Sequence, residues 1–172
     1  VDITALAFAI LAIFALDSPR AKFAGSLAGI LCACAFLVKP TFVIAGIACA
    51  VVCLRRDRRQ LAKFAVAALA AAGIALVVIL MQNGSDVFAH LLVLNRLPPD
   101  WMNFLSMFAK TAGRHPWLFC GIAMFVAMSP RKDDPVWWYA MLAPAGILFS
   151  IKTGAESNYY LEIIAAGSIA CG

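Results

Sequence analysis

The sequence is poor in charged residues. Only 13% of its 172 residues are Asp, Glu, Lys or Arg, whereas soluble domains average about 25%. Hydrophobic residues make up 64% of the chain, which excludes an ordinary soluble globular domain and predicts an integral membrane protein. The net charge of +5 is small, and we expect no nucleic-acid partner.

Histidine is almost absent, and the two present, His90 and His115, lack the spacing of a metal-binding pair. Every cysteine lies in an apolar stretch without a nearby histidine or carboxylate, which favours packing over metal binding. We therefore predict no metal site, and whether a divalent cation assists the protein stays open. The cysteines are Cys32, Cys34, Cys49, Cys53, Cys120 and Cys171.

Long hydrophobic runs are also few. Seven apolar segments can be distinguished, several of them shorter than the roughly 20 residues that span a bilayer. They predict an all-α fold, a polytopic transmembrane helix bundle with about seven membrane segments in a single domain over residues 1–172. Because the chain opens on Val1 and stops within an apolar run, we expect a fragment of a longer protein. The segments are 3–16, 23–38, 42–54, 64–81, 116–128, 135–151 and 159 onward.

The stretch 23–54 could be one helix or two. One helix of roughly 32 residues would be about 48 Å long, too long for a single straight crossing. Lys39-Pro40 interrupts it in the middle, and proline disfavours helix continuation. We expect two short helices that meet at this dipeptide.

Basic residues divide unequally if the segments alternate across the membrane. Nine of the fourteen fall on one side, which the positive-inside rule predicts to be cytoplasmic. Asp2, Lys39 and the stretch 152–162 then lie on the external side. The nine are Arg20, Lys22, Arg55, Arg56, Arg58, Arg59, Lys63, Arg131 and Lys132.

Aromatic residues mark the expected interfaces. Trp137, Trp138 and Tyr139 follow a charged turn and predict an aromatic belt on the cytoplasmic side. Trp101 and Trp117 do the same outside. The external connection of about 82–115 has helical apolar spacing on both sides of Pro98-Pro99, which predicts two short surface helices.

A polar island interrupts the apolar chain between Lys152 and Glu162. A loop that only turns the chain does not need this collection of an ammonium, carboxylates, an amide and phenols, so the island predicts a binding site. Lys39 and Lys152 could neutralise the phosphate of a lipid-linked ligand, and Glu162 could pair with Lys152 or orient a sugar hydroxyl. Snorkelling of Lys39 towards headgroups is an equal alternative. The candidate binding residues are Asp2, Lys39, Lys152, Glu156, Asn158, Tyr159 and Glu162.

These residues carry a family resemblance. The pattern formed by Lys152, Gly154, Ala155, Asn158, Tyr159, Leu161 and Glu162 resembles the late external loop of multi-pass glycosyltransferases of the C superfamily (GT-C). That group includes protein mannosyltransferases and lipid A aminoarabinose transferases. Two further stretches are similar to the same enzymes. One is 35–41, followed by an apolar helix and the basic cluster Arg55–Arg59, and the other is Val1-Asp2-Ile3 at the start of a helix.

The resemblance implies an enzyme that moves a sugar from a polyprenyl-phosphate donor to a glycan, lipid or protein acceptor. The transfer would occur on the external face of a membrane, expected to be a bacterial plasma membrane. Lys39 and Lys152 would steady the donor phosphate, while Asn158, Tyr159 and Glu162 would shape the sugar pocket. The family places its catalytic base in a first external loop, so we expect that base upstream of this chain and assign no catalytic residue here.

Two alternatives remain at this point. Short helices interrupted by proline, together with charges near the membrane, also mark secondary transporters. A non-catalytic membrane assembly subunit is the other. The charges here lie at segment ends and no internal repeat is evident, which favours the transferase.

Overall fold

The protein is built from α-helices. The computed structural model describes residues 2–17, 22–84, 99–128, 133–151 and 161–171, and it contains no β-strand within them. The all-α prediction is thus confirmed for this part of the chain. The elements are α1 (Asp2–Asp17), α2 (Ala24–Val38), α3 (Val43–Arg56), α4 (Arg58–Asn83), α6 (Trp101–Arg114), α7 (Pro116–Met128), α8 (Pro135–Leu142), the 3₁₀ helix η2 (Ala143–Ile151) and α9 (Leu161–Cys171).

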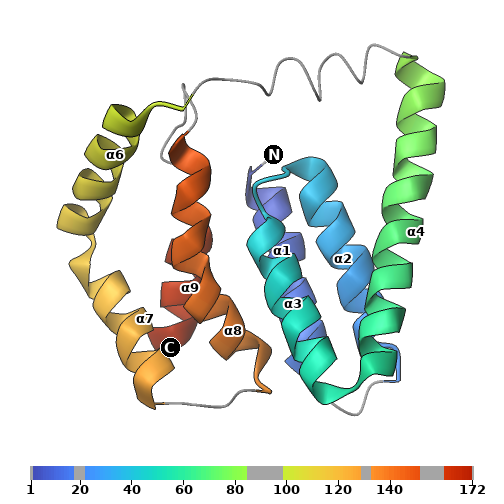
Figure 1. Ribbon diagram of the computed structural model, residues 1–172, viewed down its shortest axis with the longest axis horizontal. Coiled ribbons are helices and arrows are strands. Elements are labelled where there is room, and N and C mark those ends of the chain that lie inside the picture. Colours follow the sequence, from blue (N-terminus) through green and yellow to red (C-terminus); the bar gives the residue numbers. More distant parts are fainter. Residues whose placement is uncertain (1, 18–21, 85–98, 129–132, 152–160, 172) are drawn as a thin grey trace.

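Helices α1, α2 and α3 pack on one another at the middle of the molecule (Figure 1). Helix α4 packs mainly along α2 and forms one edge. On the other side, α8 contacts both α1 and α3, and α9 and η2 lie against α8. Helices α6 and α7 form the opposite edge. The core therefore runs from α2 through α1 and α3 to α8 and α9.

Small residues allow the central helices to approach closely. Helix α1 buries Ala5, Ala9 and Ala12, which recur at the four- and three-residue spacing of one helical face. Ala45 and Ala48 of α3 are also fully buried. Interfaces of this kind are typical of helices packed within membranes, where backbones come close over alanine and glycine.

Two glycines of α2 bring α4 into direct backbone contact. A Cβ atom at Gly29 would lie 2.3 Å from the carbonyl oxygen of Phe64, and one at Gly25 would lie 2.9 Å from that of Gln60. Neither distance can be accommodated without moving a helix. Gly25 and Gly29 thus form a G-x-x-x-G pair that sets the α2–α4 spacing.

The stretch 23–54 forms two helices, as predicted. Helix α2 ends at Val38, where Lys39 adopts an extended conformation and its N–H donates to the oxygen of Ala35. Pro40 follows, and the turn closes with a 3.1 Å bond from the N–H of Phe42 to the oxygen of Lys39. Proline has no N–H and fixes φ, so the helix cannot continue through this position.

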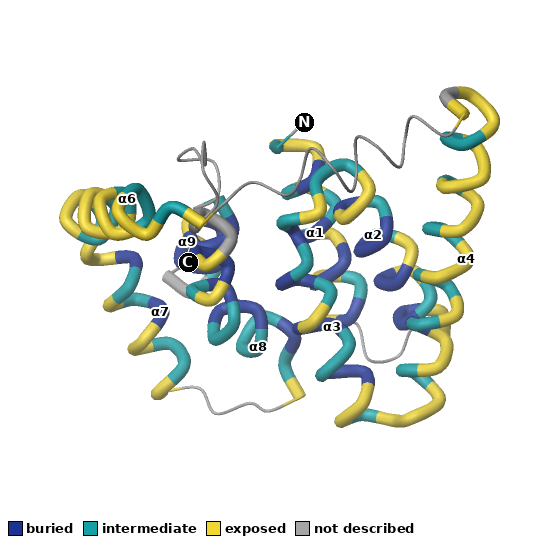
Figure 2. The backbone as a smooth tube through the Cα atoms, turned by 45° about the horizontal axis from the view of Figure 1, so that its top comes forward, coloured by how far each residue is buried: buried dark blue, intermediate teal, exposed yellow. Residues whose placement is uncertain are grey.

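Helix α4 is the longest helix in the described part of the chain, and most of its residues are exposed (Figure 2). Among the described residues it alone, over Arg58–Gln82, is long and apolar enough to cross a membrane. The other predicted segments also form helices, but shorter ones, and a bundle of seven spans stays a prediction. Helix α4 begins six residues before the predicted 64–81 segment because the Asp57 side chain accepts from the N–H of Arg59 and caps it.

The segment predicted over 135–151 divides into α8 and η2. Pro144 stands at the change, where its missing N–H interrupts the α-helical ladder. The assignment of Tyr139 to an interfacial belt was wrong, because this side chain is fully buried. Trp137 and Trp138, two residues and one residue earlier, stay partly exposed, since α8 turns a different face to the core at each position.

Helix α6 confirms the second of the two short helices expected in the 82–115 connection. It contains no buried residue, and its rings form a ridge in which Trp101, Phe104 and Phe108 lie 6.0 and 6.3 Å apart by centroid. The ridge continues to Phe119 of α7. The first predicted helix of this connection, around residues 87–94, lies outside the described residues.

Candidate functional site

The charges at one end of the bundle belong to Asp2 and Lys39. Asp2 is the first residue of α1 and Lys39 follows the last residue of α2, so the packing of these two helices brings them together. The Nζ of Lys39 lies 2.5 Å from Oδ1 of Asp2, and the two side chains are 15% and 28% exposed. Sequence reasoning placed both residues at this end but did not foresee that they pair directly. The ion pair argues against free snorkelling of Lys39.

A third titratable residue, Glu162, lies at the start of α9. It stands in the first turn of α9 and is only 4% exposed. The backbone N–H of Ala45 donates a hydrogen bond to its carboxyl group. Ala45 lies in the first turn of α3, which begins just after the Lys39–Phe42 turn, so Glu162 is at the same end of the bundle as Lys39.

Glu162 supplies the cap that α3 lacks in its own sequence. The N-cap residue of α3 is Phe42, which has no side-chain oxygen to accept a hydrogen bond. A carboxylate near the first N–H groups of a helix is also favoured by the helix dipole. Gly146 of η2 leaves room for it, because a Cβ atom there would lie 3.2 Å from Oε2 of Glu162.

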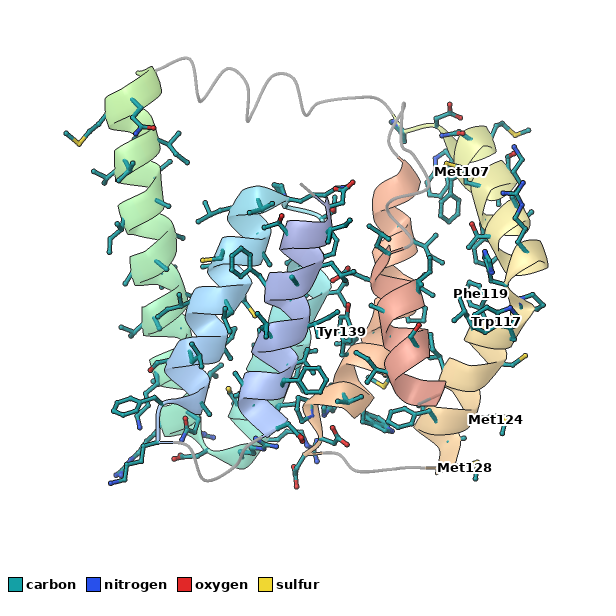
Figure 3. All side chains as sticks on the ribbon, turned by 180° about the vertical axis from the view of Figure 1, so that it is seen from behind. Met107, Trp117, Phe119, Met124, Met128 and Tyr139 are labelled. Carbon is teal, nitrogen blue, oxygen red and sulfur yellow. The ribbon has the colours of Figure 1, made fainter. Side chains whose placement is uncertain are left out.

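Two buried oxygens beside α3 have no hydrogen-bond partner within the described residues. They are Oε1 of Glu162 and the hydroxyl of Tyr139. Tyr139 lies in the interior (Figure 3), within electrostatic range of Glu162. Unpaired buried polar atoms cost free energy, so this region can accept a hydrogen bond from a hydroxyl group or a water molecule. The carboxyl group of Glu162 can also take up a proton. The burial of Tyr139 could not be read from the sequence, since its neighbours Trp137 and Trp138 suggested an interface.

The remaining predicted site residues cannot be placed against these three. Lys152, Glu156, Asn158 and Tyr159 lie outside the described residues. The described chain stops at Ile151 and resumes at Leu161, directly before Glu162. Of the seven predicted binding residues, the structure therefore brings Asp2 and Lys39 into contact and places Glu162 near them.

The opposite end of the bundle holds the basic cluster, which comprises Arg55, Arg56, Arg58, Arg59 and Lys63. Arg56 donates to the carbonyl oxygen of Leu16 and, at 2.8 Å, to that of Asp133. Arg55 lies 3.8 Å from the Asp133 carboxylate and 6.0 Å from the ring centre of Trp138. These two arginines tie the ends of α1, α3 and α8 together. Asp134 caps α8, because its side chain accepts from the N–H of Val136 at 2.8 Å.

No cluster of three metal-ligating side chains occurs in the part of the chain that the structure describes. The Asp2 carboxylate faces an ammonium group, which disfavours a divalent cation at the same oxygen. His115 is the C-cap of α6 and its ring lies 5.8 Å from that of Trp117, so it has a packing role.

Comparison with protein-family models, curated proteins and solved structures finds no match for this chain.

Proposed function

We propose that the chain is the membrane-embedded part of a glycosyltransferase that takes a sugar from a polyprenyl-phosphate donor. The acceptor would be a glycan, lipid or protein on the external side of the membrane. One observation carries the proposal: the Asp2–Lys39 ion pair and the buried Glu162 lie at one end of an otherwise apolar bundle, opposite the end with Arg55 and Arg56. The resemblance to GT-C enzymes includes Asp2, Lys39 and Glu162, which lie at that same end.

The exposed apolar surface supports a location in a membrane. Large apolar side chains of α4 are exposed; Val66 is 68% exposed and Met81 is 82% exposed. Soluble monomers rarely expose contiguous apolar patches above a few hundred Å². A bilayer would cover these side chains, with the basic residues on the cytoplasmic side.

Lys39 is suited to hold a phosphate because its ammonium has three N–H donors. Asp2 accepts from this ammonium and holds it at the end of the bundle where we propose that the donor phosphate binds. Asp2 also compensates the charge of Lys39, so the phosphate needs a second cation, and Lys152 is the candidate. Negative charge grows on the departing phosphate during sugar transfer, so fixed cations lower the barrier to reaction.

The sugar would be bound by polar groups from the start of α9 and the loop before it. Glu162 has an oxygen without a described partner, and Glu156, Asn158 and Tyr159 supply acceptors and donors for hydroxyl groups.

The test is sugar transfer by the natural polypeptide that carries this chain, reconstituted in vesicles with a labelled polyprenyl-phosphate sugar. Lys152→Ala should lower the rate by about 100-fold, the effect expected when a charge-stabilising group is removed. Glu162→Gln should lower it as well. Lys110→Ala, an exposed lysine of α6, is the matched control and should leave the rate unchanged. Unchanged transfer in both Lys152→Ala and Glu162→Gln would refute the proposal.

Secondary transport is the second candidate function. The buried Glu162, with one unpaired oxygen, favours it, since carboxyl groups inside membranes often mark ion or proton pathways. The same vesicles separate the two: a transporter accumulates a solute under a proton gradient without forming a glycosidic bond. Gradient-driven uptake that Glu162→Gln abolishes, with no sugar transfer, would favour transport.

A further inference from the structure

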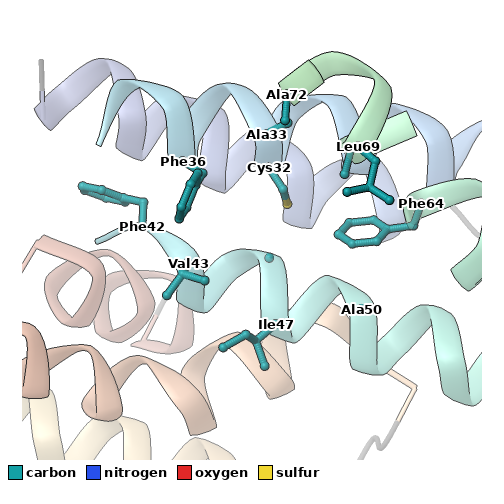
Figure 4. A pocket seen from close by; sticks show the side chains of 12 residues that line it. Cys32, Ala33, Phe36, Phe42, Val43, Ile47, Ala50, Phe64, Leu69 and Ala72 are labelled. Carbon is teal, nitrogen blue, oxygen red and sulfur yellow. The ribbon is translucent and has the colours of Figure 1, made fainter. Parts of the chain in front are cut away.

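An open apolar groove lies between α2, α3 and α4 (Figure 4). Its volume is about 340 Å³, and every side chain that lines it is apolar or a cysteine. Phe36 and Phe42 stand at the end near Lys39, and Ala50 and Phe64 at the end near the basic cluster. Nothing in the site described above uses this groove.

The basic residues at that end fall into two groups. Arg55 and Arg56 are engaged with Asp133, Leu16 and Trp138. Arg58, Arg59 and Lys63 of α4 are exposed, and none of them has a carboxylate partner among the described residues. The neighbouring Asp57 carboxylate is occupied as the N-cap of α4. The structure therefore accounts for the first group and leaves the second available.

Arg58 lies on the groove side of α4. Leu69 and Ala72, which line the groove, follow it by 11 and 14 residues, and both spacings return to the same helical face. On α3, the exposed Leu54 follows the lining residue Ala50 by one turn and extends the apolar wall in the same direction. The groove thus continues from apolar walls to a rim formed by Arg58, whereas Arg59 and Lys63 lie on other faces of α4.

We propose that this groove and rim bind one anionic phospholipid from the leaflet at the basic end. An acyl chain would occupy the groove, and the headgroup phosphate would meet Arg58. The lined part of α4, from Phe64 to Ala72, is about 12 Å long at 1.5 Å per residue. One leaflet of a bilayer core is about 15 Å thick, so the groove matches most of one acyl chain. The proposal goes beyond the transferase function and does not depend on it.

Native mass spectrometry of the chain in detergent, with added phosphatidylglycerol or phosphatidylcholine, tests the proposal. Phosphatidylglycerol should bind at about one molecule per chain and more tightly than phosphatidylcholine, with an affinity that falls as salt rises. Arg58→Gln should weaken it by about fivefold, as expected for one basic residue at an anionic headgroup. Lys110→Gln, which removes an exposed lysine elsewhere, is the control and should bind as the natural chain does.

A second variant tests the groove without threatening the fold. Gly46 lines the groove, and a Cβ atom there would make only an ordinary 3.8 Å contact with Cys32. Gly46→Leu should fill the groove, keep the thermal stability and weaken phosphatidylglycerol binding at least tenfold.

Equal binding of the two phospholipids, or unchanged binding in Arg58→Gln or in a stable Gly46→Leu, would overturn the proposal. So would an added polyprenyl phosphate that displaces phosphatidylglycerol and is itself lost in Lys39→Met, because the groove would then be entered from the Lys39 end. Loss of sugar transfer has no part in these readouts, so the transferase proposal fails or survives separately.

Discussion

Glu162 shows how one buried carboxyl group can connect distant elements. It belongs to α9, accepts from the N–H of Ala45 in α3, and fits against Gly146 of η2. The N-cap residue of α3 is Phe42, whose side chain cannot accept a hydrogen bond. The start of this helix therefore depends on Glu162, far along the chain. The turn that carries Lys39 lies directly before this helix end.

This dependence can be measured as stability. Glu162→Ala removes the cap and should destabilise the bundle by about 1–2 kcal/mol relative to Glu162→Gln, whose amide oxygen still accepts a hydrogen bond. Thermal unfolding in detergent micelles measures the difference. Equal stability of the two variants would mean that the contact with Ala45 has no structural weight.

The Asp2–Lys39 pair is partly shielded from water, so its energy should exceed that of a surface pair. A double-mutant cycle with Asp2→Asn and Lys39→Met should give a favourable coupling energy of about 1 kcal/mol in unfolding experiments. Additive effects of the two substitutions would contradict a direct pair.

At the residue scale the sequence predicted part of the site. Asp2, Lys39 and Glu162 were recognised because charges are rare in this chain, and the structure places them at one end. Their individual contacts could not be predicted, since they depend on how α1, α2, α3 and α9 pack. Tyr139 was missed for the same reason: its burial is decided by the face that α8 turns inward.

At the scale of elements, the α2–α4 contact rests on glycine. Gly29 has no side chain, and α4 occupies the place where one would be. Gly73 of α4 differs, because a Cβ atom there meets nothing within 4 Å. Substitution of Gly29 and of Gly73 by alanine should therefore change stability in opposite directions.

Gly29→Ala should cost about 1–3 kcal/mol, because the two backbones must separate. Gly73→Ala should instead stabilise the protein by about 0.5–1 kcal/mol, since alanine is the better helix former. Unfolding of both variants in the same detergent gives the comparison. Similar effects of the two substitutions would show that the α2–α4 contact is not close in solution.

Element positions were largely predictable because apolar segments and prolines delimit them. The break at Lys39-Pro40 and the helix over Trp101–Arg114 came from such signals. The early start of α4 was missed because its first turn is basic, and hydropathy alone does not detect a helix cap. The change to a 3₁₀ helix after α8 was missed because Pro144 was taken as part of one apolar segment.

At the scale of the whole molecule, the two ends of the bundle differ in charge and in the ligand that we propose for each. Helix α4 connects the two ends of the bundle (Figure 1). Its residues Arg58–Gln82 extend over about 37 Å, more than the roughly 30 Å of a bilayer core. Arg59 and Gln82 should therefore lie on opposite sides of the membrane.

Cysteine labelling of intact vesicles tests this orientation. In a background without the native cysteines, a membrane-impermeant maleimide should label Gln82→Cys from outside and Arg59→Cys only after permeabilisation. Gly73→Cys, in the middle of α4, should react in neither case. Labelling of Arg59→Cys and Gln82→Cys from the same side would exclude a crossing by α4.

The most direct measurement of the donor site is photocrosslinking with a polyprenyl-phosphate sugar that carries its reactive group at the sugar. Peptide mapping should place the label within residues 36–46 and 152–165, around Lys39 and Glu162, and Lys152→Ala should reduce it. Label found at residues 55–63, or on no peptide of this chain, would contradict a donor site at the Asp2–Lys39 end.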